Sequence, residues 1–379
     1  LKQANYDLMN FYSDYLPNLS LSYDYTKYTS QYYPSSAIDR DYKSFGLSAN
    51  MSMTVFSGGS KWLSYKAIKS DKRYESSILE DKKNEIVYYV KAACYRVIYS
   101  SEKLVTEREN LKLSEEEVAL MDEKFELGLV SKIDVLKMNV DYHSSKLALL
   151  NAQTNLEQAY RNLNHLVNFA PDSVYALDKK SVAVVDPPPI GEFLKRAEKS
   201  PRMNQIEESY NYNNLNTSQS LTSFFPSVVF KAGYSWGDDQ FPDGMTTLND
   251  DGIASFGVNM SWDIFTGGKR IISYQRSQSQ KRNAEYSREY STKSFINEIY
   301  DTYAEVIEAK SSYEMTLAQH ESAKSQLDLV QEQFNLGDAT VLELLDAKVS
   351  FASSYDNLIT SMLNYSTSFA KMEWLCPED

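Results

Sequence analysis

The sequence repeats itself once, at a constant offset of 209 residues. Four features return at this offset: Phe56-Ser57-Gly58-Gly59 as Phe265-Thr266-Gly267-Gly268, Phe125-Glu126-Leu127-Gly128 as Phe334-Asn335-Leu336-Gly337, Pro17 as Pro226, and Asp134 as Glu343. A constant offset indicates an internal duplication rather than chance similarity. Neither copy could close a barrel or bury a core alone, so we expect two equivalent halves in a quasi-symmetric assembly.

Each copy contains two segments in which apolar and polar residues alternate strictly. They lie near residues 19–26, 45–55, 228–236 and 255–264. Period two over such lengths predicts half-buried strands. The polar faces carry small hydrophilic residues, which favours a lipid-facing wall around a wet lumen over a soluble sandwich. Four strands cannot close a barrel, and lipid does not tolerate open strand edges, so several chains must share one barrel.

Long helical patterns follow the strands. Residues 60–127 and 269–336 contain neither proline nor glycine, and each would span about 100 Å as a helix. Residues seven apart form a coiled-coil seam: Val90, Val97, Leu104, Leu111, Val118 and Phe125, and in the copy Ile299, Val306, Tyr313, His320, Leu327 and Phe334. A shorter return helix follows each long one. Its predicted apolar face holds Ile133, Leu136, Val140, Leu147 and Leu150, and in the copy Leu342, Leu345, Val349, Ala352 and Ile359.

These patterns divide the chain into two structural repeats and a linker. The first repeat, 1–168, would hold a helix end, a strand hairpin at 18–56, a long helix at 60–127 and a return helix at 131–168. An equatorial linker follows at 169–200. The second repeat, 201–376, would hold a helix, a strand hairpin at 226–265, a long helix at 269–336 and a return helix at 340–374. Residues 190–209 have no counterpart before Leu1, so we expect a helix of roughly that size to be missing from the N-terminus.

Composition argues against several classes of function. A formal net charge of −13 with no apparent basic patch argues against a nucleic-acid partner. The three histidines, His143, His165 and His320, have no ligand spacing, and there is no nucleophile motif or phosphate loop. We therefore expect no enzyme activity, metal or cofactor, and a structural role for His320. Cys94 and Cys376 form no metal or redox spacing, which favours two free thiols over a disulfide.

Glycine pairs mark the change from strand period to helix period. They are Gly58 with Gly59 and Gly267 with Gly268. Glycine admits the positive φ that an abrupt change of direction needs. A phosphate-binding loop is the rival interpretation, but the spacing does not match one. These four residues are therefore the candidate barrel-to-helix transition.

The turns between long and return helices form two candidate tips. The first comprises Leu127, Gly128, Leu129, Val130 and Ser131, and the second Leu336, Gly337, Asp338, Ala339 and Thr340. Each glycine would end its long helix with a left-handed cap, and Ser131 and Thr340 would cap the return helices. An exposed Leu-Gly-Leu-Val tip is a candidate docking surface, whereas a plain turn would explain only the glycine.

Acidic residues follow each tip directly. Asp134 belongs to the first copy, and Glu343 and Asp346 share one helical face in the second. Taken alone, they express the preference for acids in the first turns of a helix. If chains surround an axis, each acid becomes a ring of carboxylates, which would select cations and respond to pH.

The doubled motifs resemble those of the TolC-type outer-membrane efflux protein family. The resemblance covers essentially the whole chain and is carried by the two glycine-pair motifs and by residues 125–134 and 334–346. It implies a mixed fold of β-barrel and all-α parts: a homotrimer with four transmembrane strands per chain, a twelve-stranded barrel and a twelve-helix periplasmic tunnel. It also implies the outer membrane of a Gram-negative-type bacterium, with the chain extending into the periplasm.

The same resemblance implies a passive exit duct, either for a tripartite efflux pump or for type I secretion. A periplasmic adaptor (a membrane fusion protein) would dock on the two tips, an inner-membrane transporter would complete the assembly, and outer-membrane lipid would surround the barrel. Glu343 and Asp346 occupy the positions of acidic rings at the closed tip. Ala339 stands where a basic residue commonly helps hold the gate shut, and Lys132 is the candidate to compensate. The alternative is a soluble or periplasmic coiled-coil scaffold or adaptor, which leaves the four strands unexplained.

Overall fold

A computed structural model describes residues 2–28, 42–178, 184–241 and 252–378; residues 179–183 of the expected linker lie outside it. The elements are α1 (Lys2–Ser13), β1 (Asn18–Tyr28), β2 (Tyr42–Ser57), α2 (Ser60–Glu126), α3 (Lys132–Val167), α4 (Ile190–Ala197), α5 (Pro201–Ser220), the 3₁₀ turn η2 (Leu221–Phe224), β3 (Ser227–Asp238), β4 (Ile253–Ser261), α7 (Lys269–Leu336) and α8 (Val341–Leu375). None of the described helices is long and apolar enough to cross a membrane.

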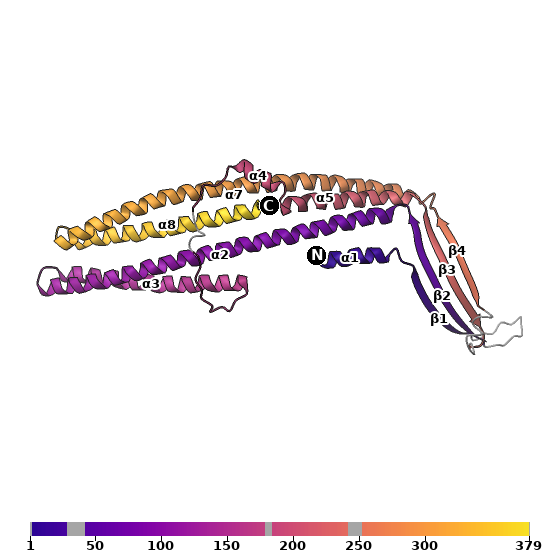
Figure 1. Ribbon diagram of the computed structural model, residues 1–379, viewed down its shortest axis with the longest axis horizontal. Helices are drawn as coiled ribbons and strands as arrows, with labels where there is room; N and C mark the ends of the chain where they lie inside the picture. The colour runs from indigo at the N-terminus through magenta and orange to yellow at the C-terminus, as the bar shows by residue number, and fades with distance from the viewer. Residues whose placement is uncertain (1, 29–41, 179–183, 242–251, 379) are drawn as a thin grey trace. The chain divides into compact units, whose positions relative to one another are not determined.

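The four strands form one antiparallel sheet in the order β1-β2-β3-β4 (Figure 1). The β2–β3 pairing joins the two repeats, with Leu47 opposite Trp236, and a register shift between Thr54 and Phe56 marks the helix end of β2. Within the described ranges, strands β1 and β4 each have a partner on one side only. Every residue of β4 is exposed, including Val258 and Met260. The chain therefore builds a sheet with two open edges and uncovered apolar side chains.

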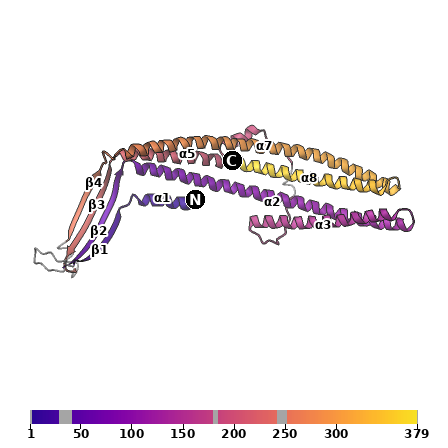
Figure 2. The same cartoon turned by 180° about the vertical axis from the view of Figure 1, so that it is seen from behind.

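The helices form two antiparallel hairpins, one in each repeat. Helices α2 and α7 have 67 and 68 residues, and α3 and α8 run back along them, as two opposite views show (Figures 1 and 2). The seam predicted from heptads is most completely buried at Val97, Ile299 and Val306, whereas Phe125 at its end is exposed. The linker adds the short helix α4, whose Phe193 and Ala197 are buried.

Contacts group the chain into two compact units that do not coincide with the sequence repeats. One unit comprises residues 1–77 and 204–291 and contains the sheet. The other comprises residues 78–203 and 292–379 and contains both tips. Each unit takes one segment from each copy, because β2 pairs with β3 in the first unit and the two hairpins meet in the second.

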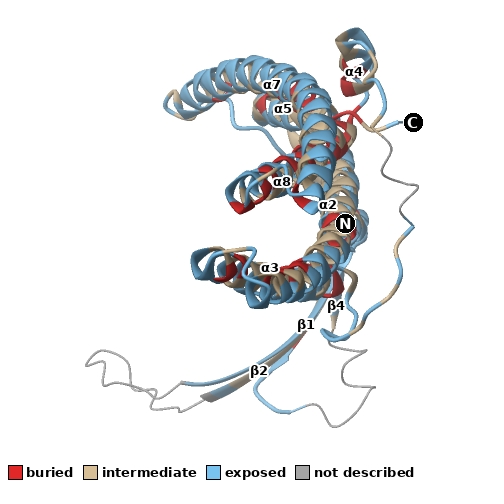
Figure 3. Cartoon of the chain, turned by 90° about the vertical axis from the view of Figure 1, so that its left-hand side faces the viewer, coloured by how far each residue is buried: buried red, intermediate tan, exposed pale blue. Residues whose placement is uncertain are grey.

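The apolar face predicted for the return helix is real, but on α3 the chain itself does not cover it. Its five residues are each more than half exposed: Ile133, Leu136, Val140, Leu147 and Leu150. The buried side of α3 is a different one, formed by Val135, Met138, Ala152, Ala159 and Leu163. At 100° per residue the two sets lie on opposite sides of the helix. Figure 3 shows buried and exposed faces on both α3 and α8. We call the five exposed residues the α3 stripe.

On α8 the predicted apolar face is divided. Leu342, Val349 and Ala352 are exposed, whereas Leu345 and Ile359 are half-buried. The fully buried side of α8 includes Leu344 and Leu358.

All four transition glycines have positive φ, between +61° and +85°. At Gly58 a side chain would also collide with its surroundings: a Cβ atom would lie 2.5 Å from the Thr222 carbonyl oxygen and 2.9 Å from Phe225 Cβ. At Gly59 the same atom would meet nothing within 4 Å. The first bend thus depends on glycine both for its conformation and for close packing against η2.

Substituting these glycines should separate the two requirements. We expect Gly58→Ala to lower the free energy of unfolding by more than about 2 kcal/mol, because strain and collision add, and Gly59→Ala by about 1 kcal/mol, from strain alone. Denaturant unfolding of the detergent-extracted protein measures both. Gly257→Ala, in open space on β4 and without a positive φ, is the control and should have little effect. Equal effects at positions 58 and 59 would contradict the collision argument.

Candidate functional site

The two tip turns have the same backbone construction. Gly128 and Gly337 adopt left-handed conformations, with φ of +71° and +87°. In the first turn, Gly128 N–H donates to the Phe125 carbonyl and Leu129 N–H to the Lys124 carbonyl, both at 2.9 Å. In the second, Gly337 N–H donates to Phe334 and Asp338 N–H to Gln333. This pair of bonds is the Schellman motif, which satisfies carbonyl groups at a helix end.

Capping boxes start both return helices. The Ser131 hydroxyl accepts from Asp134 N–H, and the Asp134 carboxylate accepts from the Ser131 backbone and hydroxyl. Thr340 and Glu343 repeat the arrangement, with the Thr340 N–H 2.7 Å from Glu343 Oε2. Hydrogen bonds from the Ser131 side chain lower the pKa of Asp134, and those from the Thr340 backbone lower the pKa of Glu343. These two acids therefore hold the helix starts and stay ionised in mild acid.

The third predicted acid, Asp346, is exposed one turn beyond Glu343 on α8. It takes part in no capping box. Glu343 is also exposed, whereas Asp134 is half-buried. The second tip thus presents two carboxylates to its surroundings, one anchored by a cap and one without that anchor.

The tips expose large apolar side chains. Leu127, Leu129 and Leu336 are each at least 70% exposed. A groove of about 1010 Å³ lies between the two turns; its walls include Val130 and Thr340. Unlike the leucines, Val130 and Ala339 pack inward. The structure therefore brings both predicted tips to one groove. A plain turn would explain neither the groove nor the exposed leucines.

A small hydrophobic core holds the two hairpins together just behind the groove. Its buried residues come from four helices: Met121 of α2, Val135 and Met138 of α3, Phe334 of α7, and Val341 and Leu344 of α8. Lys124 of α2 also lies over the Phe334 ring of α7, 4.8 Å from its centroid. Separating the hairpins would expose this core.

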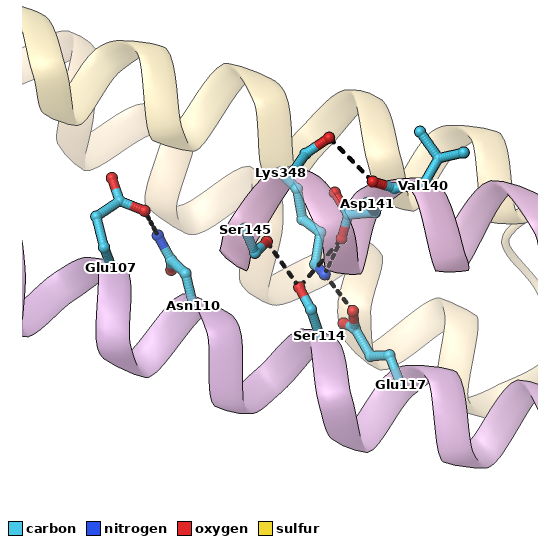
Figure 4. Close-up of polar contacts among 9 residues, drawn as sticks. Glu107, Asn110, Ser114, Glu117, Val140, Asp141, Ser145 and Lys348 are labelled. Carbon is cyan, nitrogen blue, oxygen red and sulfur yellow. Dashed lines mark hydrogen bonds and ion pairs between the residues drawn. The ribbon is translucent and has the colours of Figure 1, made fainter. Parts of the chain in front are cut away.

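Above this core, Lys348 of α8 reaches the carboxylates of the other hairpin (Figure 4). Its Nζ contacts the Glu117 carboxylate of α2 and lies 3.1 Å from Asp141 Oδ2 of α3. The Ser114 hydroxyl donates to the same Asp141 oxygen at 3.1 Å and is hydrogen bonded to Ser145. We call these five residues the Lys348 cluster. It joins the hairpins by charge where the core joins them by apolar contact.

The Lys348 cluster lies mostly out of water. The side chains of Lys348 and Glu117 are 16% and 8% exposed. Burial raises the pKa of Glu117, and the Lys348 ammonium opposes that rise. One cation faces two carboxylates, so without the lysine two partly buried anions would repel each other. No spacing in the sequence signals this lysine, because its partners come from helices over 200 residues away.

Lys132 does not link the hairpins. Its ammonium lies over the Phe125 ring, 5.2 Å from the centroid, and both residues belong to the first hairpin. Near the tips, cationic contacts that cross between the hairpins come instead from Lys124 and Lys348. Further from the tips, Lys91 and Lys103 of α2 pair with Glu373 and Asp356 of α8. His320 makes a hydrogen bond from Nδ1 to Ser354 at 3.2 Å, and burial lowers its pKa, which fits the structural role expected for it.

Sequence reasoning also missed a pair of cations at the glycine bends. Lys61 Nζ donates to the carbonyls of Asp14 and Thr54 and lies over the Tyr15 ring. The second copy repeats the arrangement: Arg270 donates to the carbonyls of Ser223 and Ile264 and lies over the Phe224 ring. The Ile264 carbonyl lies one residue past the equivalent of Thr54. Lys61, Asp14 and Tyr15 return as Arg270, Ser223 and Phe224 at the 209-residue offset. The 209-residue offset could have indicated that these two cations have equivalent roles.

Comparison with known proteins supplies the context for this geometry. The family model described as "Outer membrane efflux protein" matches residues 1–168 and 197–374. TolC of Escherichia coli is 23% identical over 64% of this chain, and the chain spans about half (51%) of that relative's length. TolC of Vibrio cholerae is 21% identical over 83% of the chain and 72% of its own length. The alkaline protease secretion protein AprF of Pseudomonas aeruginosa is 20% identical over 81% of the chain and 63% of its own length.

Solved structures share the fold at low sequence identity. CusC, described for its folding and transmembrane channel formation, has a TM-score of 0.86 at 15% identity, over 100% of this chain and 87% of its own. The outer membrane channel CmeC of Campylobacter jejuni has a TM-score of 0.80 at 18% identity, over 100% and 82%. These comparisons confirm the predicted fold class, an internally duplicated chain of membrane strands and long helical hairpins.

The Lys348 cluster should be a main electrostatic support of the tip. We expect Lys348→Ala to lower the free energy of unfolding by about 3 kcal/mol at neutral pH, because it leaves buried carboxylates unpaired. The loss should shrink as the pH falls, since protonation removes the repulsion, and adding Glu117→Gln should recover part of it. Denaturant unfolding across pH measures this.

Lys371→Ala is the matched control. Lys371 pairs with Glu305 at 3.2 Å across the hairpin surface, with 30% and 52% of the two side chains exposed. Its loss should cost less than about 1 kcal/mol. If the two lysine variants were equally stable at every pH, the Lys348 cluster would have no special role.

Proposed function

Because this chain belongs to the outer membrane efflux protein family, we propose that it forms the exit duct of an efflux pump or of a type I secretion system. The family consists of outer-membrane channel proteins, which are not enzymes, and an outer-membrane location follows from membership. The observation that carries the proposal is the four-stranded sheet with two open edges and an uncovered apolar face. A soluble scaffold or adaptor would have no use for such a sheet.

In the proposed assembly, three protomers share one barrel. Lipid offers no hydrogen-bond partners, so β1 of one protomer must pair with β4 of the next. Three sheets of four strands give twelve strands, an even number in the range of outer-membrane barrels. Two copies would give eight strands, which leave an interior filled by side chains rather than an aqueous duct.

The α3 stripe supports the same assembly away from the sheet. Five large apolar side chains in one row, on the side of α3 opposite its own chain, need a cover. In the proposed homotrimer that cover is a helix of the neighbouring copy. Six hairpins then enclose a tunnel of twelve helices that extends into the periplasm.

The tips form the proposed gate and adaptor site. The groove between the two turns, rimmed by exposed leucines, suits the apolar end of a periplasmic adaptor, which would connect the duct to an inner-membrane transporter. Glu343 and Asp346 would form acidic rings around the threefold axis, with Asp134 of the first sequence repeat nearby. Opening would require the hairpins to separate, and the Lys348 cluster with the core behind it opposes that movement.

The duct would be passive, and its cargo would be chosen elsewhere. Relatives include both efflux proteins and a protein named for alkaline protease secretion. Small molecules and polypeptides are therefore both within the proposed range.

Native mass tests the assembly. Detergent-extracted protein should have a mass near three times 43.4 kDa and form channels in planar bilayers. Val140→Glu with Leu147→Glu should reduce the trimer fraction, because two charges would enter an apolar contact. Gln153→Glu, exposed on α3 but off the stripe, should assemble normally. A monomer or dimer that forms no channels would reject the duct, and full assembly of the double variant would remove the stripe from the interface.

Ion selectivity tests the gate. Glu343→Gln with Asp346→Asn should lower cation selectivity and weaken block by multivalent cations, because a carboxylate ring at a constriction attracts them. Reversal potentials in asymmetric salt measure this. Asp346→Asn alone should leave the Thr340 cap intact and still lower selectivity. Unchanged selectivity in the double variant would place both acids outside the pore.

A further inference from the structure

The helix end of the sheet is basic in an otherwise acidic chain. Residues 44–70 contain three lysines and no acidic residue, and residues 264–284 contain five basic residues and no acidic one. Residues 209–226, which approach the same bends, carry no charge at all. The net charge of the whole chain is −13. The expectation that no basic patch exists was therefore wrong for this region.

Five of these cations are exposed, and four of them lie within ten residues of a bend glycine: Lys66, Lys69, Lys269 and Arg276. We call them the junction cations. Lys66 Nζ lies 3.7 Å from the centroid of Trp62, and Lys69 Nζ lies 4.8 Å from that of Tyr65. Within the described part of the chain, none of the four forms an ion pair with a carboxylate. Their charge is thus not neutralised locally.

Lys61 and Arg270 differ from the junction cations. Both side chains are half-buried, and both donate hydrogen bonds to backbone carbonyls at the bends. They fix the turn from strand to helix and have little capacity for an external ligand. The exposed cations, Lys269 directly at its bend and the other three one or two turns beyond Lys61 or Arg270, donate no hydrogen bond to a backbone carbonyl within the described residues.

Large apolar side chains lie beside the junction cations. Trp62 is 59% exposed, Phe265 85% and Ile272 65%. The strand register places Ser57, Ser227 and Ser261 together at this end of the sheet, so the apolar side chains stand where the strands stop. Aromatic rings with cations just beyond a band of exposed apolar strand residues are typical of a membrane–water interface.

We infer that this end of the sheet binds anionic phospholipid headgroups in the inner leaflet of the outer membrane. The inference rests on the proposed function, which puts the helices on the periplasmic side. Lys269 lies directly at its bend, Lys66 and Arg276 lie roughly 10–12 Å along their helices, and Lys69 lies about 15 Å along. The headgroup layer is about 5–8 Å thick on each side of a bilayer, and long basic side chains can extend back into it.

Charge complementarity determines the choice of lipid. Cations without carboxylate partners attract phosphate, and a headgroup with net negative charge is favoured over a zwitterionic one. The exposed aromatic and isoleucine side chains would contact the adjoining acyl chains. Together they bind phosphatidylglycerol in preference to phosphatidylcholine, by at least about fivefold, the effect of roughly one cation at an anionic surface.

Brominated lipids test this directly in a chain that keeps Trp62 as its single tryptophan, with Trp236, Trp262 and Trp374 replaced by phenylalanine, because Trp62 lies at the site and bromine quenches tryptophan fluorescence on contact. The full-length chain in nanodiscs would be titrated with brominated phosphatidylglycerol and, separately, brominated phosphatidylcholine. The preference should be at least about fivefold and should fall in high salt. Replacing all four junction cations with glutamine should bring it close to one. A control variant, Lys83→Gln with Lys112→Gln, changes exposed lysines of α2 more than 20 residues past Gly59 and should keep the preference.

Channel conductance and circular dichroism on the same preparations separate the possible failures. If the wild-type protein conducts but quenching is equal for both lipids, or if the folded four-cation variant keeps the preference, the lipid inference is wrong and the duct stands. If the folded wild-type protein neither trimerises nor conducts, the proposed function is wrong. If the four-cation variant keeps its lipid preference but changes ion selectivity, the cations face the pore, which also overturns the inference.

Discussion

The hydrogen-bonding capacity of two strand edges constrains everything else in this protein. A sheet of four antiparallel strands leaves one side of β1 and one side of β4 without partners. In water such edges can be solvated, but in lipid each unsatisfied group costs several kcal/mol. Because β4 exposes its apolar face, we expect the sheet to contact lipid. The open edges then require pairing with strands of neighbouring chains. Symmetry, tunnel and gate in the proposed assembly all follow from that requirement.

The duplication explains how one chain satisfies this constraint with little sequence conservation between its halves. The cations at the two bends show the principle. Lys61 became Arg270 and Tyr15 became Phe224, yet each cation binds two carbonyls and one ring. Because carbonyl groups belong to the backbone, the partners survive any substitution at their positions. Contacts of this kind persist when side-chain identities drift, and they preserve the same turn in both copies.

Sequence patterns predicted the elements better than their surroundings. Helical and strand periods predicted the long helices and the strands, although β4 ends at Ser261, before the predicted end of its hairpin at residue 265. The glycines have the positive φ that the bends require. Periodicity reveals which residues share a face of a helix, but not what covers that face. The α3 stripe is therefore correct as a pattern but turned away from the chain's own core. The role of Lys348 was not predicted for a related reason. Its partners lie on a different hairpin, and the spacing of residues in one sequence does not reveal contacts that only the tertiary fold creates.

Charge is distributed along the molecule in a way that its net value conceals. The bends carry exposed cations that form no ion pair with a carboxylate among the residues the structure describes, whereas the second tip presents Glu343 and Asp346. In the proposed assembly each charge type is stabilised by its surroundings: basic side chains would lie beside a headgroup layer that attracts them, and acids lie at helix starts, where backbone N–H groups stabilise them. The capping boxes keep Asp134 and Glu343 ionised in mild acid, so charge at the tips persists under conditions in which ordinary surface acids begin to neutralise. The bends and the second tip therefore have opposite electrostatic character, although both belong to a chain of net charge −13.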